Sequence, residues 1–84
     1  MTAAQERAVV VFGRPGCHLC ADALAVIERV RAREPFTLEQ RDIDGDEALL
    51  TRYLERIPVV TIDGDERFEL FVDEDAFEQA IRET

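Results

Sequence analysis

Hydrophobic and polar residues follow two different periods in the first half of the chain. The continuous apolar run at 8–12 predicts a central strand covered on both faces, which ends at Gly13. Over 17–33, apolar residues recur every three or four positions, the period of an amphipathic helix. Apolar and polar residues alternate over 36–43, which predicts a second strand. A strand, a helix and a strand at this spacing predict a right-handed crossover between parallel strands.

The second half predicts a shorter helix, a hairpin and a last helix. Apolar residues at 49, 50, 53 and 54 form a short helical stripe that ends before Pro58. Residues 59–62 and 67–72 predict two antiparallel strands, because an Asp-Gly pair between them is typical of a hairpin turn. Asp73 is placed to cap a last helix that ends at Arg82. We therefore expect an α/β domain of order βαβαββα, with a four-stranded mixed sheet flanked by helices, over residues 1–84.

Net charge and hydropathy exclude several classes of function. The formal net charge of −9 gives a surface that repels nucleic-acid phosphates. No apolar run approaches the roughly 20 residues needed to cross a bilayer. Residues 1–7 lack the apolar region of a signal peptide. We therefore expect a cytoplasmic protein, a monomer, that binds neither nucleic acid nor membrane.

The segment Cys17-His18-Leu19-Cys20 contains both cysteines of the chain, and their thiols are its candidate reactive groups. At the junction of a strand and a helix, Cys17 is expected in the first helical turn, where unpaired amide groups and the positive end of the helix dipole favour a thiolate. Cys20, three residues later, lies on the same helical face and on the buried stripe, close enough for a disulfide. A reactive thiolate and a shielded second thiol match dithiol–disulfide exchange, with Cys17 as nucleophile and Cys20 as the resolving residue.

Two other interpretations of this pair stay open. The cysteines can be buried structural residues that share this spacing by chance. They can also bind zinc, but a structural zinc site needs four ligands and the chain has two Cys and one His, so such a site requires a dimer. We therefore predict no metal site within one chain.

The predicted element order, with a Cys-x-x-Cys motif opening the first helix, resembles the thioredoxin fold in its short, glutaredoxin-like form. Three segments, 11–20, 42–44 and 56–59, are similar to the short bacterial glutaredoxin-like domains of unknown function. The resemblance implies a thiol-disulfide oxidoreductase whose partners are a protein disulfide substrate and a thiol reductant. It implies no bound cofactor, with glutathione as one candidate reductant. The alternative is a non-catalytic interaction module or redox sensor on the same fold.

The resemblance also implies residues that bind the substrate. Pro58 matches the cis-proline of the superfamily, which would leave the N–H and C=O groups of Ile57 free to pair with an extended substrate. A trans proline that opens a strand is the alternative. Arg14 matches a basic residue that would receive a substrate carboxylate, although an ordinary loop arginine fits the sequence equally well. His18, if cationic, would stabilise the Cys17 thiolate.

Three departures from the glutaredoxin pattern concern the substrate. His18-Leu19 replaces the usual dipeptide between the cysteines, so the redox potential does not carry over. Arg56 replaces a threonine. Phe71-Val72 replaces a Gly-Gly pair whose N–H groups hold a glutathione carboxylate, which leaves glutathione binding open. We expect Phe71 on the outer face of an edge strand, either as ordinary surface or as a docking residue.

Overall fold

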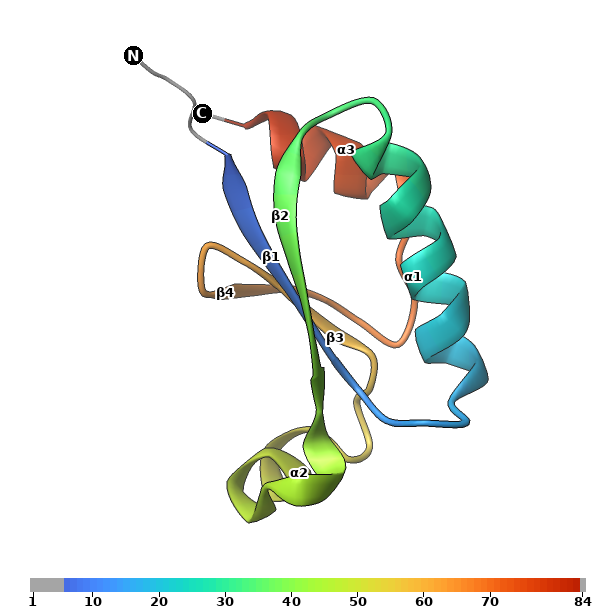
Figure 1. Ribbon diagram of the computed structural model, residues 1–84, viewed down its shortest axis with the longest axis vertical. Coiled ribbons are helices and arrows are strands. Elements are labelled where there is room, and N and C mark those ends of the chain that lie inside the picture. Colours follow the sequence, from blue (N-terminus) through green and yellow to red (C-terminus); the bar gives the residue numbers. More distant parts are fainter. Residues whose placement is uncertain (1–5, 84) are drawn as a thin grey trace.

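A four-stranded mixed sheet of strand order β2-β1-β3-β4 forms the centre of the computed structural model, which describes residues 6–83 (Figure 1). The interior strand β1 (Arg7–Gly13) pairs in parallel with β2 (Phe36–Asp42). On its other side β1 pairs antiparallel with β3 (Val59–Ile62), which in turn pairs antiparallel with β4 (Asp65–Glu69). The predicted parallel crossover and the predicted hairpin are both confirmed.

Within residues 6–83, three α-helices complete the expected order, and one short 3-10 turn is added to it. The long helix α1 (His18–Arg31) and the last helix α3 (Glu74–Arg82) lie side by side on one face of the sheet (Figure 1). A 3-10 turn (Ile43–Gly45) follows β2 and leads into α2 (Glu47–Tyr53), which lies at the end of the sheet where β2 ends. Asp73 caps α3, as predicted, by accepting a hydrogen bond from the backbone N–H of Ala76.

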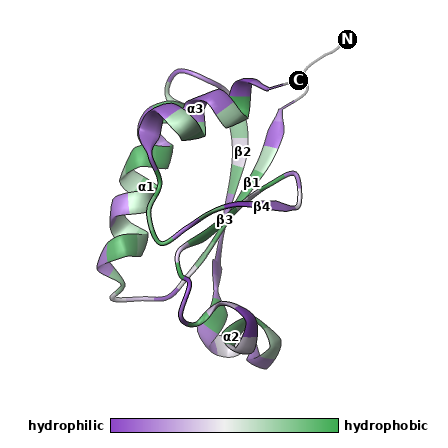
Figure 2. Cartoon of the chain, turned by 180° about the vertical axis from the view of Figure 1, so that it is seen from behind, coloured by the Kyte–Doolittle hydropathy of each residue, from purple (hydrophilic) through white to green (hydrophobic). Residues whose placement is uncertain are grey.

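The main core lies between the sheet and the pair of helices α1 and α3. The side chains that form it are apolar and almost fully buried: Val9, Val11, Ile27, Val30, Phe36, Val60, Ile62, Phe77, Ala80 and Ile81. The predicted apolar stripes of α1 and α3 therefore face the sheet. By contrast, β4 at the edge of the sheet is mainly hydrophilic (Figure 2).

The second face of β1 is less covered than its sequence predicts. Val9 and Val11 are buried under the helices, whereas Val10 and Phe12 on the opposite face are only half-buried. The helix on this side, α2, is short and packs at one end of the strand through Tyr53, whose ring centroid is 4.8 Å from that of Phe12. The predicted central position of this strand is confirmed, but its second face is only partly covered.

The fourth strand begins and ends earlier than predicted. Asp63 and Gly64 have φ values of 53° and 91°, and this two-residue turn sets Asp65 directly opposite Ile62. The strand then ends at Glu69, because the next residue has a positive φ that turns the chain out of the sheet. The predicted range 67–72 was wrong, and Phe71 lies in the loop before α3 instead of on an edge strand.

Candidate functional site

The loop after β1 positions the cysteine pair. Pro15 and Gly16 turn the chain, and Gly16 has a φ of 79°, a conformation that favours glycine. Cys17 follows with extended backbone angles and is the N-cap residue of α1, one position before the first helical residue. The prediction that Cys17 lies inside the first turn was thus off by one residue. Because Cys17 is the N-cap residue, its side-chain sulfur faces the free amide groups of the first helical turn.

A disulfide joins Cys17 to Cys20, with a Cα–Cα distance of 5.2 Å. The Sγ atom of Cys17 accepts a hydrogen bond from the backbone N–H of Cys20 at 3.1 Å. Cys17 is half-buried, whereas Cys20 is 6% exposed and belongs to the buried face of α1. Cys17 is therefore the more accessible residue of the pair and Cys20 the more buried one, in the order that the sequence predicts.

Gly13, the last residue of β1, lies directly against Cys20. A Cβ atom at this position would be 2.8 Å from Cys20 Sγ, a separation that real Cβ atoms essentially never show. The absence of a side chain at Gly13 therefore makes room for the buried sulfur. Sequence analysis identified Gly13 only as the end of a strand, and its position next to the motif was the signal that could have pointed to this contact.

Pro58 is buried at the start of β3, and the Ile57–Pro58 peptide bond is cis. Because Phe12 is paired with Val59, Pro58 lies beside the loop that leads from β1 to Cys17. The backbone N–H and C=O of Ile57 form no hydrogen bond to any other residue of the described range 6–83. Ile57 thus has an unpaired donor and an unpaired acceptor next to the cysteine motif.

Arg14 and His18 are exposed on either side of Cys17. Arg14 forms an ion pair with Asp44, at 3.1 Å, in the turn that follows β2. Its guanidinium is therefore directed toward Asp44, a partner that sequence reasoning did not identify. His18 is the first residue of α1. The roles predicted for these two side chains stay predictions.

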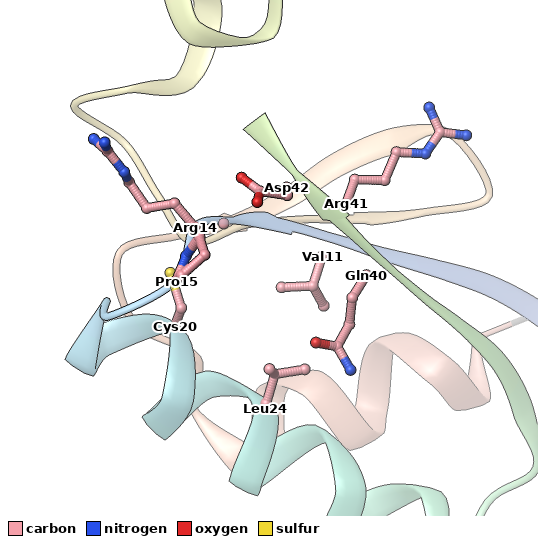
Figure 3. A pocket seen from close by; sticks show the side chains of 9 residues that line it. Val11, Arg14, Pro15, Cys20, Leu24, Gln40, Arg41 and Asp42 are labelled. Carbon is pink, nitrogen blue, oxygen red and sulfur yellow. The ribbon is translucent and has the colours of Figure 1, made fainter. Parts of the chain in front are cut away.

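A pocket of about 280 Å³ lies beside Cys20, between α1 and the edge strand β2 (Figure 3). Val11 and Leu24 contribute apolar walls, and Cys20 lines one end. Gln40 and Asp42 of β2 add polar groups on the opposite side. Arg14 and Pro15, in the loop before α1, also line the pocket, which therefore connects the buried cysteine to this loop.

A cluster of charged and aromatic residues supports the segment before Pro58. Arg56 donates hydrogen bonds to Glu66 and to Glu69, and its guanidinium lies 5.5 Å from the centre of the Tyr53 ring. The Tyr53 hydroxyl donates to Glu66 at 3.1 Å. The hydrogen bond from Arg56 lowers the pKa of Glu66, while burial and then the bond to Glu66 raise the pKa of Tyr53. Arg56 therefore connects the end of α2 to β4.

In the part of the chain that the structure describes, neither a membrane-spanning helix nor a cluster of metal-binding side chains is found. No helix there has the length and hydropathy needed to cross a membrane. In the same residues, no group of three or more His, Cys, Asp or Glu is arranged to hold a metal ion.

Comparison with known proteins places these features in a family. Residues 8–82 match the model of the glutaredoxin-like domain DUF836. The solution structure of protein Ne2328 from Nitrosomonas europaea is 32% identical, with a TM-score of 0.82 over 96% of this chain and 98% of that one. Protein XcR50 from X. campestris is 26% identical, with a TM-score of 0.72 over 86% and 92%. No curated protein matches the chain.

The likeness extends to thioredoxins. A mutant thioredoxin from Halobacterium salinarum is 25% identical, with a TM-score of 0.64 over 90% of this chain and 72% of that one. The sheet order, the position of the helices and the cysteine pair at the start of α1 agree with this likeness. Since the family model matches nearly the whole chain, the protein belongs to the glutaredoxin-like domain family and has a thioredoxin fold.

Proposed function

We propose that this protein is a thiol-disulfide oxidoreductase in which Cys17 is the nucleophile and Cys20 the resolving cysteine. The observation that carries the proposal is the position of Cys17 Sγ, which caps α1 and accepts the N–H of Cys20 at 3.1 Å. A thiolate at this place gains the same hydrogen bond and the positive end of the helix dipole. Cys17 is half-buried and Cys20 is 6% exposed, so Cys17 is the more accessible of the two residues to a substrate.

The reaction proceeds in two exchanges. The Cys17 thiolate attacks one sulfur of the substrate disulfide; the substrate S–S bond breaks, and the other substrate sulfur leaves as a thiolate. Cys20 then loses its proton to solvent and attacks Cys17 Sγ. The Cys17–Cys20 disulfide forms, and the second substrate sulfur leaves. Two electrons have passed to the substrate, and an external thiol reductant returns two electrons to the protein.

The unpaired backbone groups of Ile57 support a protein segment as the substrate. An extended segment that pairs with this N–H and this C=O adds one short stretch of β-structure beside Pro58. Backbone pairing of this kind holds the substrate disulfide near Cys17, and this contribution does not itself depend on the side chains of the substrate. We propose no bound cofactor, and we leave glutathione as one of the thiols to be tested as the reductant.

Alkylation of the reduced protein tests the nucleophile. We expect iodoacetamide to modify Cys17 with a half-maximal rate at a pH below about 8.5, the value of a free thiol. The Cys20→Ser variant should accumulate a mixed disulfide with its substrate, and the Cys17→Ser variant, which is its matched control, should not. A Cys17 that reacts at neutral pH no faster than a free thiol would refute the proposal. A reactive Cys17 without turnover of any disulfide would favour a redox sensor.

A further inference from the structure

We infer that a groove beside the cysteine motif selects protein segments that carry an apolar side chain next to the disulfide, and that Phe71 is the residue that makes this selection. The inference rests on the proposed function. The groove has a volume of about 100 Å³ and lies between α1 and the loop before α3. Its apolar lining residues are Leu19, Ala23, Val26, Leu70, Phe71 and Val72. Leu19 belongs to the Cys17–Cys20 motif itself, so the groove begins at the candidate site.

A tight backbone turn presents Phe71 to solvent. Leu70 has a φ of 69°, which is unusual for a residue with a side chain, and the N–H of Phe71 donates to the C=O of Glu69 at 2.7 Å. Phe71 is 70% exposed as a result. Conformations of this kind persist only where the surrounding structure holds them, and they are concentrated at sites that bind ligands. The exposed ring is therefore held in place by a specific turn.

Two contacts connect this turn to the segment that carries Pro58. The N–H of Leu70 donates to the C=O of Pro58 at 2.9 Å. The Nε atom of Arg56 donates to the carboxylate of Glu69, also at 2.9 Å. Because the turn is joined to the residues on both sides of Ile57, a segment that pairs with the free backbone of Ile57 passes beside the turn. Phe71 is thus placed to contact a side chain close to the substrate cysteine.

The charges around the groove favour an extended protein segment over glutathione as the occupant. Asp22 is the charged residue that lines the groove, and within residues 6–83 it forms no ion pair. Asp73 lies close to Phe71 in the sequence, whereas the nearby Glu69 is paired with Arg56, and the whole chain has a net charge of −9. Glutathione has two carboxylates, which the acidic surface repels, and it has no apolar side chain to contact the apolar walls of the groove. A segment with an apolar residue and neutral or basic neighbours fits the apolar walls and the acidic rim.

Matched disulfide-bonded peptides test the selection. One peptide carries Leu next to its cysteine, a second carries Ser at the same position, and glutathione disulfide is the third substrate. With the reduced protein we expect kcat/KM for the Leu peptide to exceed that for the Ser peptide about tenfold, equivalent to about 1.4 kcal/mol. In the Phe71→Ser variant this ratio should fall to about one. Since the Phe71 side chain is exposed, the fold should persist, and thermal unfolding checks this.

The chain offers a matched control for this substitution. Within residues 6–83, Leu54 is the other large apolar residue that is exposed, at 44%, and it follows α2, away from the groove. Leu54→Ser should leave the Leu-to-Ser ratio of kcat/KM unchanged. A second arm replaces Asp22 by Asn, which should reduce the preference for a Lys-bearing over a Glu-bearing peptide ~two- to fivefold.

The outcomes separate this inference from the function on which it rests. Equal rates for the Leu and Ser peptides would overturn the inference, and so would faster reduction of glutathione disulfide than of either peptide. An unchanged Leu-to-Ser ratio in Phe71→Ser would also overturn it. In each of these results turnover persists, so the oxidoreductase proposal stands. A wild-type protein that reduces no disulfide at all refutes the proposed function and this inference together.

Discussion

Replacement of Gly13 by Ala should force the end of β1 and the sulfur of Cys20 apart. The new Cβ would lie 2.8 Å from Cys20 Sγ and 3.4 Å from Cys20 Cβ. The second distance is an ordinary contact, whereas the first requires that one of the two groups move. Both lie in buried parts of the chain, where overpacking usually lowers the free energy of unfolding by about 1–3 kcal/mol.

A matched substitution separates the clash from the general effect of replacing glycine. At Gly45, in the turn after β2, an added Cβ meets nothing within 4 Å. Gly45→Ala should leave stability unchanged or raise it by about 0.4–1 kcal/mol, because alanine restricts the unfolded chain. Gly13→Ala should gain the same stabilisation from the unfolded chain, but overpacking should destabilise its folded state. We therefore expect Gly13→Ala to be less stable than Gly45→Ala by about 1–3 kcal/mol, and its melting temperature to be lower by about 4–8 °C per kcal/mol in a domain of this size.

A double-mutant cycle identifies the sulfur as the atom responsible. Urea unfolding followed by circular dichroism should show that Gly13→Ala destabilises the wild-type protein but has little effect in a Cys20→Ala background, where Sγ is absent. A destabilisation of equal size in both backgrounds would refute the reasoning. So would a Gly13→Ala protein as stable as Gly45→Ala.

Two further predictions concern the stability of the fold. Asp73→Ala removes the side chain that accepts the N–H of Ala76 at 2.9 Å and should cost about 0.5–2 kcal/mol in urea unfolding, whereas Asp73→Asn, which can still cap the helix, should cost less. The N–H of Ala8 and the guanidinium of Arg7 lower the pKa of Asp63 in the folded protein. The stabilisation from this carboxylate is therefore complete above its unfolded-state pKa and is lost as the pH falls through the lower folded-state value. Wild type and Asp63→Asn should differ in free energy of unfolding at pH 7 and converge in acid below about pH 4, and a difference that persists unchanged there would contradict this assignment.

The local pattern of residues was enough to predict most of the secondary structure and the cysteine pair. The apolar stripe of α1 placed Cys20 on the buried face, and the position of the motif after a strand placed Cys17 at the start of the helix. The boundary of β4 was the main error. Alternation continued through Val72, but the positive φ of Leu70 ended the strand at Glu69. The hydrogen bond from Leu70 to Pro58, twelve residues away, has no signal in a local period.

By itself, the sequence determined which faces of the helices and strands are apolar and where two thiols meet a helix N-terminus, because these properties depend on neighbours within one or two turns of the chain. Only the tertiary structure decided which distant residues surround those thiols. The pairing of β1 with β3 brings Pro58 beside the cysteine loop, and the packing of α1 on β1 brings Cys20 against Gly13. Such contacts arise from chain crossovers, and their partners are set by how whole elements pack and not by the residues adjacent to them.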